Sequence, residues 1–314
     1  DASMCLPLGD HSTEDGASAF VNPMTALGFV ENAKADGQDA ILHTVGASNL
    51  GQMLTRICKE DGFGLVNIVR KNEQVDLLKG LGATHVVNSI DDDFMDRLSG
   101  AIRETGAFYG FDPVGGGKHV DMSFRAMERV AIQQMTEFSR YGSNQQKRMF
   151  IYGRLDTSPT LLTPSYGFGW TLSGWLLFPF LQSVGQETMG RMRQRVRDNL
   201  TTTFASTYKS RVSLEDMLEK DAVLDYSAMR TGEKYALVVK HTGAASPIKG
   251  AAANLKKQIT LSACYSENFP DPSYCSDAVF EMASTARNDN AAIVRLGFAV
   301  AEVGKVPEPS KNKL

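Results

Sequence analysis

The feature that most constrains this chain is a regular alternation of short β-type runs and helical patterns between Ala40 and about Val114. Runs rich in β-branched and aromatic residues cover 40–44, 64–69, 82–88 and 107–111, and a fifth covers 147–152. Between them, apolar residues recur at helical spacing, as at Leu50, Met53 and Ile57. Because helices that join parallel strands make right-handed crossovers, this alternation predicts an α/β fold with a doubly wound parallel sheet.

The pattern is weaker after the fifth run, and it defines the expected organisation of the chain. We expect an apolar insertion over 156–185, a helix over 186–200, a strand over 235–240 and a mainly helical segment over 277–303. The predicted parts are a hinge or linker over 1–30, a nucleotide-binding domain over 31–241, and a partly helical C-terminal extension of unknown role over 242–314.

Composition excludes several classes of protein. With 42% hydrophobic and 22% charged residues, the 314-residue chain is typical of a soluble globular protein. The 33 basic and 36 acidic residues give a net charge of −3, so no footprint for nucleic acid is present. The apolar run 166–181 contains Gly, Ser, Thr and Pro and is shorter than the roughly 20 residues of a membrane-spanning helix. The compartment stays open between the cytoplasm and an organelle.

Cysteine and histidine show no metal-binding pattern. The cysteines are Cys5, Cys58, Cys264 and Cys275. Their wide spacing excludes a small disulfide scaffold and any Cys-x-x-Cys site, and the five histidines do not cluster. We therefore expect no metal. Cys264 and Cys275 flank a turn-rich run, where a disulfide and two free thiols are both compatible with the spacing.

The first predicted strand runs directly into a glycine-containing turn, Val45 to Gly51, which opens the first helix. A doubly wound fold places its phosphate-binding loop here, because backbone N–H groups and the helix dipole face an anion. Gly46 and Gly51 fit the usual glycine pattern, whereas Ser48 replaces the middle glycine. A tight turn with no ligand is the alternative, but the strand before it and the helix after it favour nucleotide binding.

The end of the second predicted strand indicates which dinucleotide is expected. Folds that prefer NAD place an acidic residue there to bind the ribose hydroxyls. This chain instead has Arg70 and Lys71, and two adjacent cations suit a 2′-phosphate. The pair favours NADP over NAD, with a solvated strand end as the alternative.

Two further glycine-containing segments follow the fourth and fifth strands. They are Asp112 to Gly117 and the pair Tyr152 and Gly153. The carboxyl ends of parallel strands meet at one edge of the sheet, which is where ligands bind in open α/β folds. Both segments are therefore candidate ligand contacts, although either one could be a simple turn. Tyr152 is a candidate proton donor or a packed aromatic residue.

At these residues the chain resembles a known family. The runs that carry the likeness are FVNPMTALGF, HTVGASNLGQML, LVNIVRKNEQVDLLKGLGATHVVNS, FDPVGGG, IYGRLDTSPT and GWTLSGWLLFPFL. Over about Ala2 to Lys240 the chain is similar to the medium-chain dehydrogenase/reductase superfamily, and in particular to its quinone-oxidoreductase-like members that are called zinc-binding dehydrogenases. This resemblance implies a Rossmann domain that binds NADP(H). The implied cofactor contacts are Thr25, Gly46, Ala47, Ser48, Asn49, Leu50, Gly51, Arg70, Lys71, Val114, Gly115, Tyr152 and Gly153.

The chain departs from the family pattern in two ways. Members of the family begin with a GroES-like catalytic domain, whereas Asp1 to Asp15 resembles the hinge that follows it and Tyr235 to Lys240 resembles the strand that returns to it. The family's substrate-polarising groups, and its zinc ligands where it has them, come largely from that domain. No residue of this chain is therefore assigned as catalytic. The segment after Lys240 is the second departure, because the family pattern does not account for it.

Three functions remain open from the sequence. The first is an NADP(H)-dependent oxidoreductase that transfers hydride to or from a carbonyl, a quinone or an activated alkene. The second is a non-catalytic accessory subunit of a larger assembly, such as an organellar membrane complex, in which the cofactor has been lost. The third is a redox-sensing module that binds NADP(H) without turnover. We expect a homo-oligomer or a subunit that docks through 166–181 and 242–314.

Overall fold

The computed structural model describes residues 6, 8–227, 234–238, 278–286 and 292–300. The chain divides into two compact units. One is continuous and comprises residues 22–192, and the other combines residues 1–21 with residues 193–314. Each unit has its own sheet and is described separately.

The continuous unit contains a six-stranded sheet. Its strands are β1 (Ala40–His43), β2 (Gly64–Val69), β3 (His85–Asn88), β4 (Tyr109–Asp112), β5 (Lys147–Ile151) and β6 (Trp170–Gly174). They lie in the order β3-β2-β1-β4-β5-β6, and every neighbouring pair is parallel. The predicted α/β fold with a doubly wound parallel sheet is confirmed, and the first five strands lie where the sequence predicts them.

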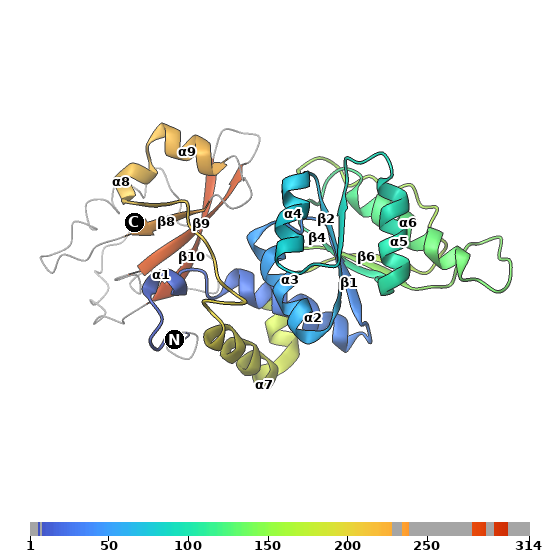
Figure 1. Ribbon diagram of the computed structural model, residues 1–314, viewed down its shortest axis with the longest axis horizontal. Coiled ribbons are helices and arrows are strands. Elements are labelled where there is room, and N and C mark those ends of the chain that lie inside the picture. The colour runs from blue at the N-terminus through green and yellow to red at the C-terminus, as the bar shows by residue number, and fades with distance from the viewer. Residues whose placement is uncertain (1–5, 7, 228–233, 239–277, 287–291, 301–314) are drawn as a thin grey trace, which may run out of the picture. The chain divides into compact units, whose positions relative to one another are not determined.

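Helices cover both faces of this sheet. They are α2 (Val21–Ala35), α3 (Asn49–Asp61), α4 (Asn72–Gly80), α5 (Phe94–Thr105) and α6 (His119–Gln133), whereas α7 (Leu177–Asp198) begins in this unit and ends in the other. Figure 1 shows α2, α3 and α4 on one face and α5 and α6 on the other. This arrangement follows from right-handed crossovers, which run from β1 to β3 in one direction along the sheet and from β4 to β5 in the opposite direction.

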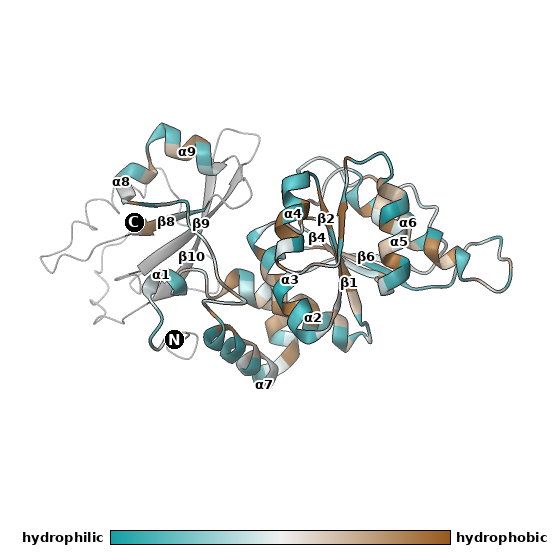
Figure 2. Cartoon of the chain, in the orientation of Figure 1, coloured by the Kyte–Doolittle hydropathy of each residue, from teal (hydrophilic) through white to brown (hydrophobic). Residues whose placement is uncertain are grey.

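The core of this unit forms because alternate strand residues pack under helices on opposite faces. Leu42, Val66 and Met149 are fully buried in one cluster with residues of α5 and α6. On the opposite face, the ring of Phe29 on α2 stacks on Phe111 of β4, with 3.9 Å between their centroids. Figure 2 shows the same pattern, with hydrophobic strands inside and hydrophilic residues on the outer turns of the helices.

Part of the predicted apolar insertion belongs to the sheet. Residues Trp170–Gly174 form β6, which pairs with β5 along its whole length. Trp170 and Leu172 pack against the core, whereas Thr171 is exposed, so the short run alternates as a half-buried strand does. This glycine-flanked run forms a strand because it pairs with β5. The two segments are not adjacent in the sequence, so the run alone does not indicate the pairing. The helix expected over 186–200 is the second part of α7, which follows a non-helical break at Gly185 (φ +78°) and ends at Asp198.

The discontinuous unit is built on a smaller, four-stranded sheet. Its elements are α1 (Thr13–Gly16), β7 (Ser210–Val212), α8 (Leu214–Met217), α9 (Lys220–Ser227), β8 (Tyr235–Val238), β9 (Ala278–Ala286) and β10 (Ala292–Val300). The strand order is β10-β9-β8-β7. The Arg211 guanidinium on β7 donates to the Glu14 carboxylate on α1, with Nε 2.6 Å from Oε2. This contact joins the start of the chain to a strand about 200 residues later.

The helical prediction for 277–303 is wrong. The two regular segments described there, β9 and β10, are antiparallel strands, and β9 also pairs with β8. The β-branched and aromatic residues such as Val279, Phe280 and Ile293 suit a strand, and a strand partner is available in β8. The C-terminal extension thus contributes strands to this sheet. Cys264 and Cys275 lie outside the described residues.

Candidate functional site

The candidate site lies at the carboxyl edge of the larger sheet, where the strand order reverses between β1 and β4. In open α/β sheets, connections leave this point in opposite directions and so leave a crevice for a ligand. The glycine-containing turn 45–51 lies just after β1, Asp112 ends β4 and Tyr152 follows β5. The predicted site residues of three separate segments are therefore brought to one edge.

The turn after β1 has the geometry of a helix start. Gly46 N–H donates to the Ile68 carbonyl at 3.0 Å, and the Ser48 hydroxyl caps α3 by accepting from Gly51 N–H at 3.0 Å. A Cβ at Gly51 would lie 2.1 Å from the Gly46 carbonyl oxygen, so only glycine fits this turn. Ser48 and Asn49 remain partly exposed at the start of α3. The turn can thus present polar groups to an anion, and its glycine is also required by the chain's own packing.

Arg70 and Lys71 lie at the carboxyl end of β2, and both side chains are exposed. Lys71 occupies the N-cap position of α4, and Arg70 N–H donates to the Gln74 side chain at 3.1 Å. In the described ranges, neither cation forms an ion pair with a carboxylate. Both charges are therefore free to bind an anionic ligand group.

The glycine segment after β4 packs tightly against the segment after β5. Gly115 has a φ of +78°, which favours glycine, and a Cβ there would lie 2.9 Å from the Gly153 carbonyl oxygen. Asp156 N–H donates to the Val114 carbonyl at 2.9 Å, which fastens the following segment over this loop. Packing between these two segments of the chain is thus enough to require glycine here, without a ligand. Val114 is partly exposed, and ligand contact at these positions stays a prediction.

A histidine that the sequence analysis did not single out lies beside Tyr152. His43 ends β1 with no exposed surface, and its Nε2 lies 2.6 Å from the Tyr152 hydroxyl oxygen. Burial lowers the pKa of His43 to about 3, so the imidazole is neutral. Burial, and then the charge of Asp112, raise the pKa of Tyr152 well above its ordinary value. The sequence signal that could have pointed to His43 is its position as the one polar residue of the strand Ala40–His43.

Two further residues at or near this edge are Asp112 and Thr25. The Asp112 carboxylate is fully buried and accepts hydrogen bonds from the Thr44 hydroxyl and from Gly115 N–H, the latter at 2.7 Å. Thr25 is buried on α2 one turn before Phe29, whose ring centroid lies 4.7 Å from that of Tyr152. The helix that carries Thr25 therefore packs onto the site, while contact of Thr25 itself with a ligand stays a prediction.

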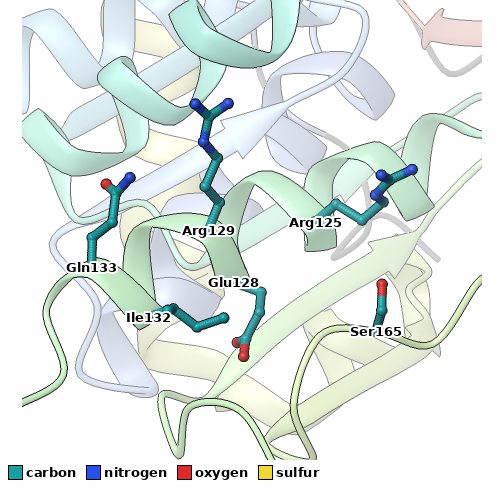
Figure 3. Close-up of a pocket in the computed structure, with 6 residues that line it drawn as sticks. All are labelled: Arg125, Glu128, Arg129, Ile132, Gln133 and Ser165. Atoms are coloured by element: carbon teal, nitrogen blue, oxygen red, sulfur yellow. The ribbon is translucent and has the colours of Figure 1, made fainter. Parts of the chain in front are cut away.

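A shallow cavity of about 320 Å³ lies elsewhere, along α6 (Figure 3). Its lining residues are Arg125, Glu128, Arg129, Ile132, Gln133 and Ser165. Arg129 pairs with Asp96 at 2.6 Å, and Glu128 pairs with Lys147 at 2.8 Å. Because these charges are already partnered, the cavity offers little to a charged ligand.

Neither a metal site nor a membrane-spanning helix is found in the described part of the chain. No three His, Cys, Asp or Glu side chains there gather in a way that could hold a metal ion. Among the helices that the structure describes, none combines the length and apolar character needed to cross a membrane.

Strand order and edge geometry define a doubly wound α/β domain of the dinucleotide-binding type. Residues 49–131, about a quarter of the chain, match the family of zinc-binding dehydrogenases. The resemblance drawn from the sequence is confirmed. A search of curated proteins gives no match.

Solved structures give the same assignment of fold. A Mesorhizobium loti protein described as an NADPH:quinone reductase matches with 26% identity and a TM-score of 0.59, covering 73% of this chain and 61% of that one. A mycobacterial protein complexed with NADPH has 21% identity and a TM-score of 0.53, with 73% and 65% covered. A Bacillus thuringiensis protein described as an NADPH:quinone reductase has 18% identity and a TM-score of 0.52, with 70% and 62% covered. The chain thus spans about three fifths of the length of these proteins.

Proposed function

We propose that this chain binds NADP(H) at the carboxyl edge of its larger sheet and acts as an oxidoreductase on a carbonyl, a quinone or an activated alkene. The observation that carries the proposal is the pair of exposed cations, Arg70 and Lys71, which form no ion pair within the described ranges and lie at the strand end where the ribose phosphate of a dinucleotide would lie. When bound, the nicotinamide supplies or accepts hydride. The NADPH complex of the mycobacterial structure and the zinc-binding dehydrogenase match support this assignment.

Each side chain has a distinct role in the proposed site. Ser48 and Asn49, at the start of α3, would face the pyrophosphate together with the positive end of the helix dipole. Arg70 and Lys71 would bind the 2′-phosphate through charge-assisted hydrogen bonds. Tyr152 and Val114, on the other half of the edge, would contact the nicotinamide half. These roles, the remaining contacts implied by the family and the domain boundaries at residues 30 and 241 are proposals.

The experiment that tests this function is a titration of the folded protein with NADPH and NADH, followed by fluorescence and by thermal shift. Arg70→Glu should weaken NADPH binding about 10- to 100-fold, because a charged hydrogen bond is replaced by repulsion. NADH, which lacks the 2′-phosphate, should lose far less affinity. Lys79→Glu is the matched control, since Lys79 is an exposed lysine of α4 away from the strand end.

The outcomes separate the alternatives. Binding of NADPH together with oxidation of NADPH by a quinone or an unsaturated carbonyl would support the enzyme. Binding without turnover of any such substrate would favour the redox-sensing module. Failure of the folded protein to bind either nucleotide would contradict the proposal and favour the accessory subunit.

One observation favours a role in an assembly. Strand β6 ends the larger sheet, so its outer backbone groups have no strand partner in the described part of the chain. Exposed apolar residues flank it, with Phe168 82% exposed and Leu176 65% exposed. Open strand edges with apolar neighbours are sites of pairing with other chains. We propose docking through 166–181, either to a second copy of this chain or to a partner subunit.

A further inference from the structure

A polar residue lies inside the larger sheet, against the turn that follows β1. Asn67 of β2 has no exposed surface, and its strand neighbours Val66 and Ile68 pack in the hydrophobic core. A buried amide costs free energy unless it is hydrogen-bonded. The contacts of the Asn67 side chain therefore account for an amide at this position.

A chain of hydrogen bonds joins Asn67 to the start of α3. The Asn67 side-chain amide donates to the Thr55 hydroxyl oxygen at 3.2 Å, and this hydroxyl donates to the Gly51 carbonyl at 2.9 Å. Gly51 N–H in turn donates to the Ser48 hydroxyl at 3.0 Å. Thr55 is 2% exposed, so these hydrogen bonds run through the interior of the unit from β2 to the residue that caps α3.

The Asn67 side chain also touches the turn directly. A Cβ at Gly46 would lie 2.7 Å from Asn67 Oδ1 and 2.8 Å from Asn67 Cβ, so the Gly46 backbone packs onto this side chain. Asn67 Oδ1 is buried and has no hydrogen-bond partner among the residues that the structure describes. Asn67 thus contacts both glycines of the turn, Gly46 by packing and Gly51 through Thr55.

The two polar side chains add little to the net stability of the fold. A hydrogen bond between neutral groups contributes modestly once the lost bonds to water are counted, and the unpaired acceptor carries a penalty of its own. An apolar pair of the same shape would therefore fill this space at a similar free energy. An apolar pair would not supply the directional tie between β2 and the turn.

We propose that Asn67 and Thr55 are positioning residues that hold the turn 46–51 in the geometry that receives the pyrophosphate of the dinucleotide. This inference rests on the proposed function, in which Ser48 and Asn49 face the pyrophosphate. Backbone N–H groups at a helix start bind an anion only when they converge on it, and such sites tolerate displacements of about 0.5 Å. Both positioning side chains are buried, so they act through the turn.

The first test needs no ligand and compares amide hydrogen exchange in the original protein and in a double variant, Asn67→Leu with Thr55→Val. The double variant replaces both partners by apolar side chains of similar shape, so its melting temperature should stay within a few degrees. Gly51 N–H should exchange about tenfold faster, because the turn opens more readily. The amide of Ile102, buried on α5, should exchange at its original rate.

Two results of this first test would overturn the inference. Equal exchange of Gly51 N–H in the two proteins would show that the side chains do not hold the turn. A double variant that does not fold would show that the pair supports the fold itself.

The second test compares two ligands that share the 2′-phosphate. 2′-Phospho-ADP-ribose contains the pyrophosphate, whereas adenosine 2′-monophosphate lacks it, and NMR titration measures both. The double variant should bind 2′-phospho-ADP-ribose about tenfold more weakly and adenosine 2′-monophosphate within about twofold of the original affinity. Thr55→Ser keeps the hydroxyl and should restore binding of 2′-phospho-ADP-ribose. Ser123→Ala is the matched control, since it removes a buried hydroxyl that donates to a helix carbonyl, that of His119 on α6 at 2.8 Å.

The results distinguish this inference from the function on which it rests. If the double variant binds 2′-phospho-ADP-ribose as tightly as the original protein does, the positioning role is overturned while NADP(H) binding stands. If the double variant weakens both ligands equally, the pair supports the whole edge and the inference is also overturned. If the original folded protein binds neither these ligands nor NADPH, the proposed function fails together with the inference.

Discussion

At the scale of single residues, Gly51 shows how the chain and a ligand can require the same amino acid. A Cβ at this position would lie 2.1 Å from the Gly46 carbonyl oxygen, and backbone cannot yield as a flexible side chain can. The turn that would face a pyrophosphate is therefore also a packing constraint between β1 and α3. Loss of binding in a Gly51 variant would consequently report folding as much as recognition, which is why Arg70 is the better probe of the cofactor.

We predict that Gly51→Ala destabilises the protein by about 1–3 kcal/mol or more, because it overpacks the turn. The matched control is Gly100→Ala on α5, where a Cβ meets no atom within 4 Å. That variant should gain about 0.5–1 kcal/mol, since alanine is the better helix former. Urea denaturation measures both, and equal effects of the two substitutions would contradict this account of Gly51.

His43 gives a prediction for the pH dependence of stability. Its pKa is lowered from 6.5 to about 3 by burial in the folded protein, so between these values the unfolded chain binds one more proton. The contribution of His43 to the free energy of unfolding is present in full above pH 6.5. It falls by about 1.4 kcal/mol for each pH unit below that value. The loss attributable to His43 between pH 6.5 and pH 5 is therefore about 2 kcal/mol.

Urea denaturation at pH 7.5 and pH 5 measures this term, with His43→Gln as the comparison. The variant lacks the titrating group and should lose about 2 kcal/mol less than the original protein over the same interval. An identical loss in the two proteins would show that His43 becomes protonated in the folded state.

At the scale of elements, a buried ion pair fastens β5 to α6. Lys147 Nζ lies 2.8 Å from a Glu128 carboxylate oxygen, and the two side chains are 0% and 3% exposed. Ser143 N–H donates to the other Glu128 oxygen at 2.8 Å, and Lys147 also donates to the Gln145 carbonyl at 2.6 Å. Every charge here is paired and hydrogen-bonded, so the cluster holds structure and is not a candidate for catalysis.

Lys147→Met should cost about 3–5 kcal/mol, because it leaves the Glu128 carboxylate buried without its cation. Adding Glu128→Gln removes that charge while keeping an acceptor for Ser143, and should recover a large part of the loss. A double-mutant cycle of unfolding free energies measures the coupling. Additive losses from the two substitutions would contradict the buried pair.

At the scale of the whole molecule, the two units differ in how their strands meet. The six-stranded sheet is parallel, and a helix lies between each two successive strands from β1 to β5. The four-stranded sheet gathers β7 and β8 with β9 and β10, and α1 from the start of the chain joins it through Glu14 and Arg211. The larger sheet presents β6 as an open edge, and this edge carries the prediction of assembly.

We predict that the chain self-associates or docks through β6, and that a charge on this edge reduces association. Thr171 is exposed at the centre of β6, so Thr171→Lys should weaken association while leaving the melting temperature within a few degrees. Thr201→Lys places the same charge at an exposed position of the other unit. Sedimentation over a range of protein concentrations compares the three proteins, and an unchanged association constant in Thr171→Lys would rule out this edge.

The amino-acid sequence by itself determined the parallel sheet, because alternating β-type and helical runs report locally which residues must be buried. It also placed the glycine turn, Arg70 and Tyr152 at one edge, since the carboxyl ends of parallel strands converge. Only the tertiary structure decided that 170–174 is a sixth strand and that 278–286 is a strand, because a strand partner is distant in sequence. The same holds for the contact between His43 and Tyr152, 109 residues apart. Periodicity gives the face of an element, but the partner of a buried polar atom depends on the packing of the whole domain.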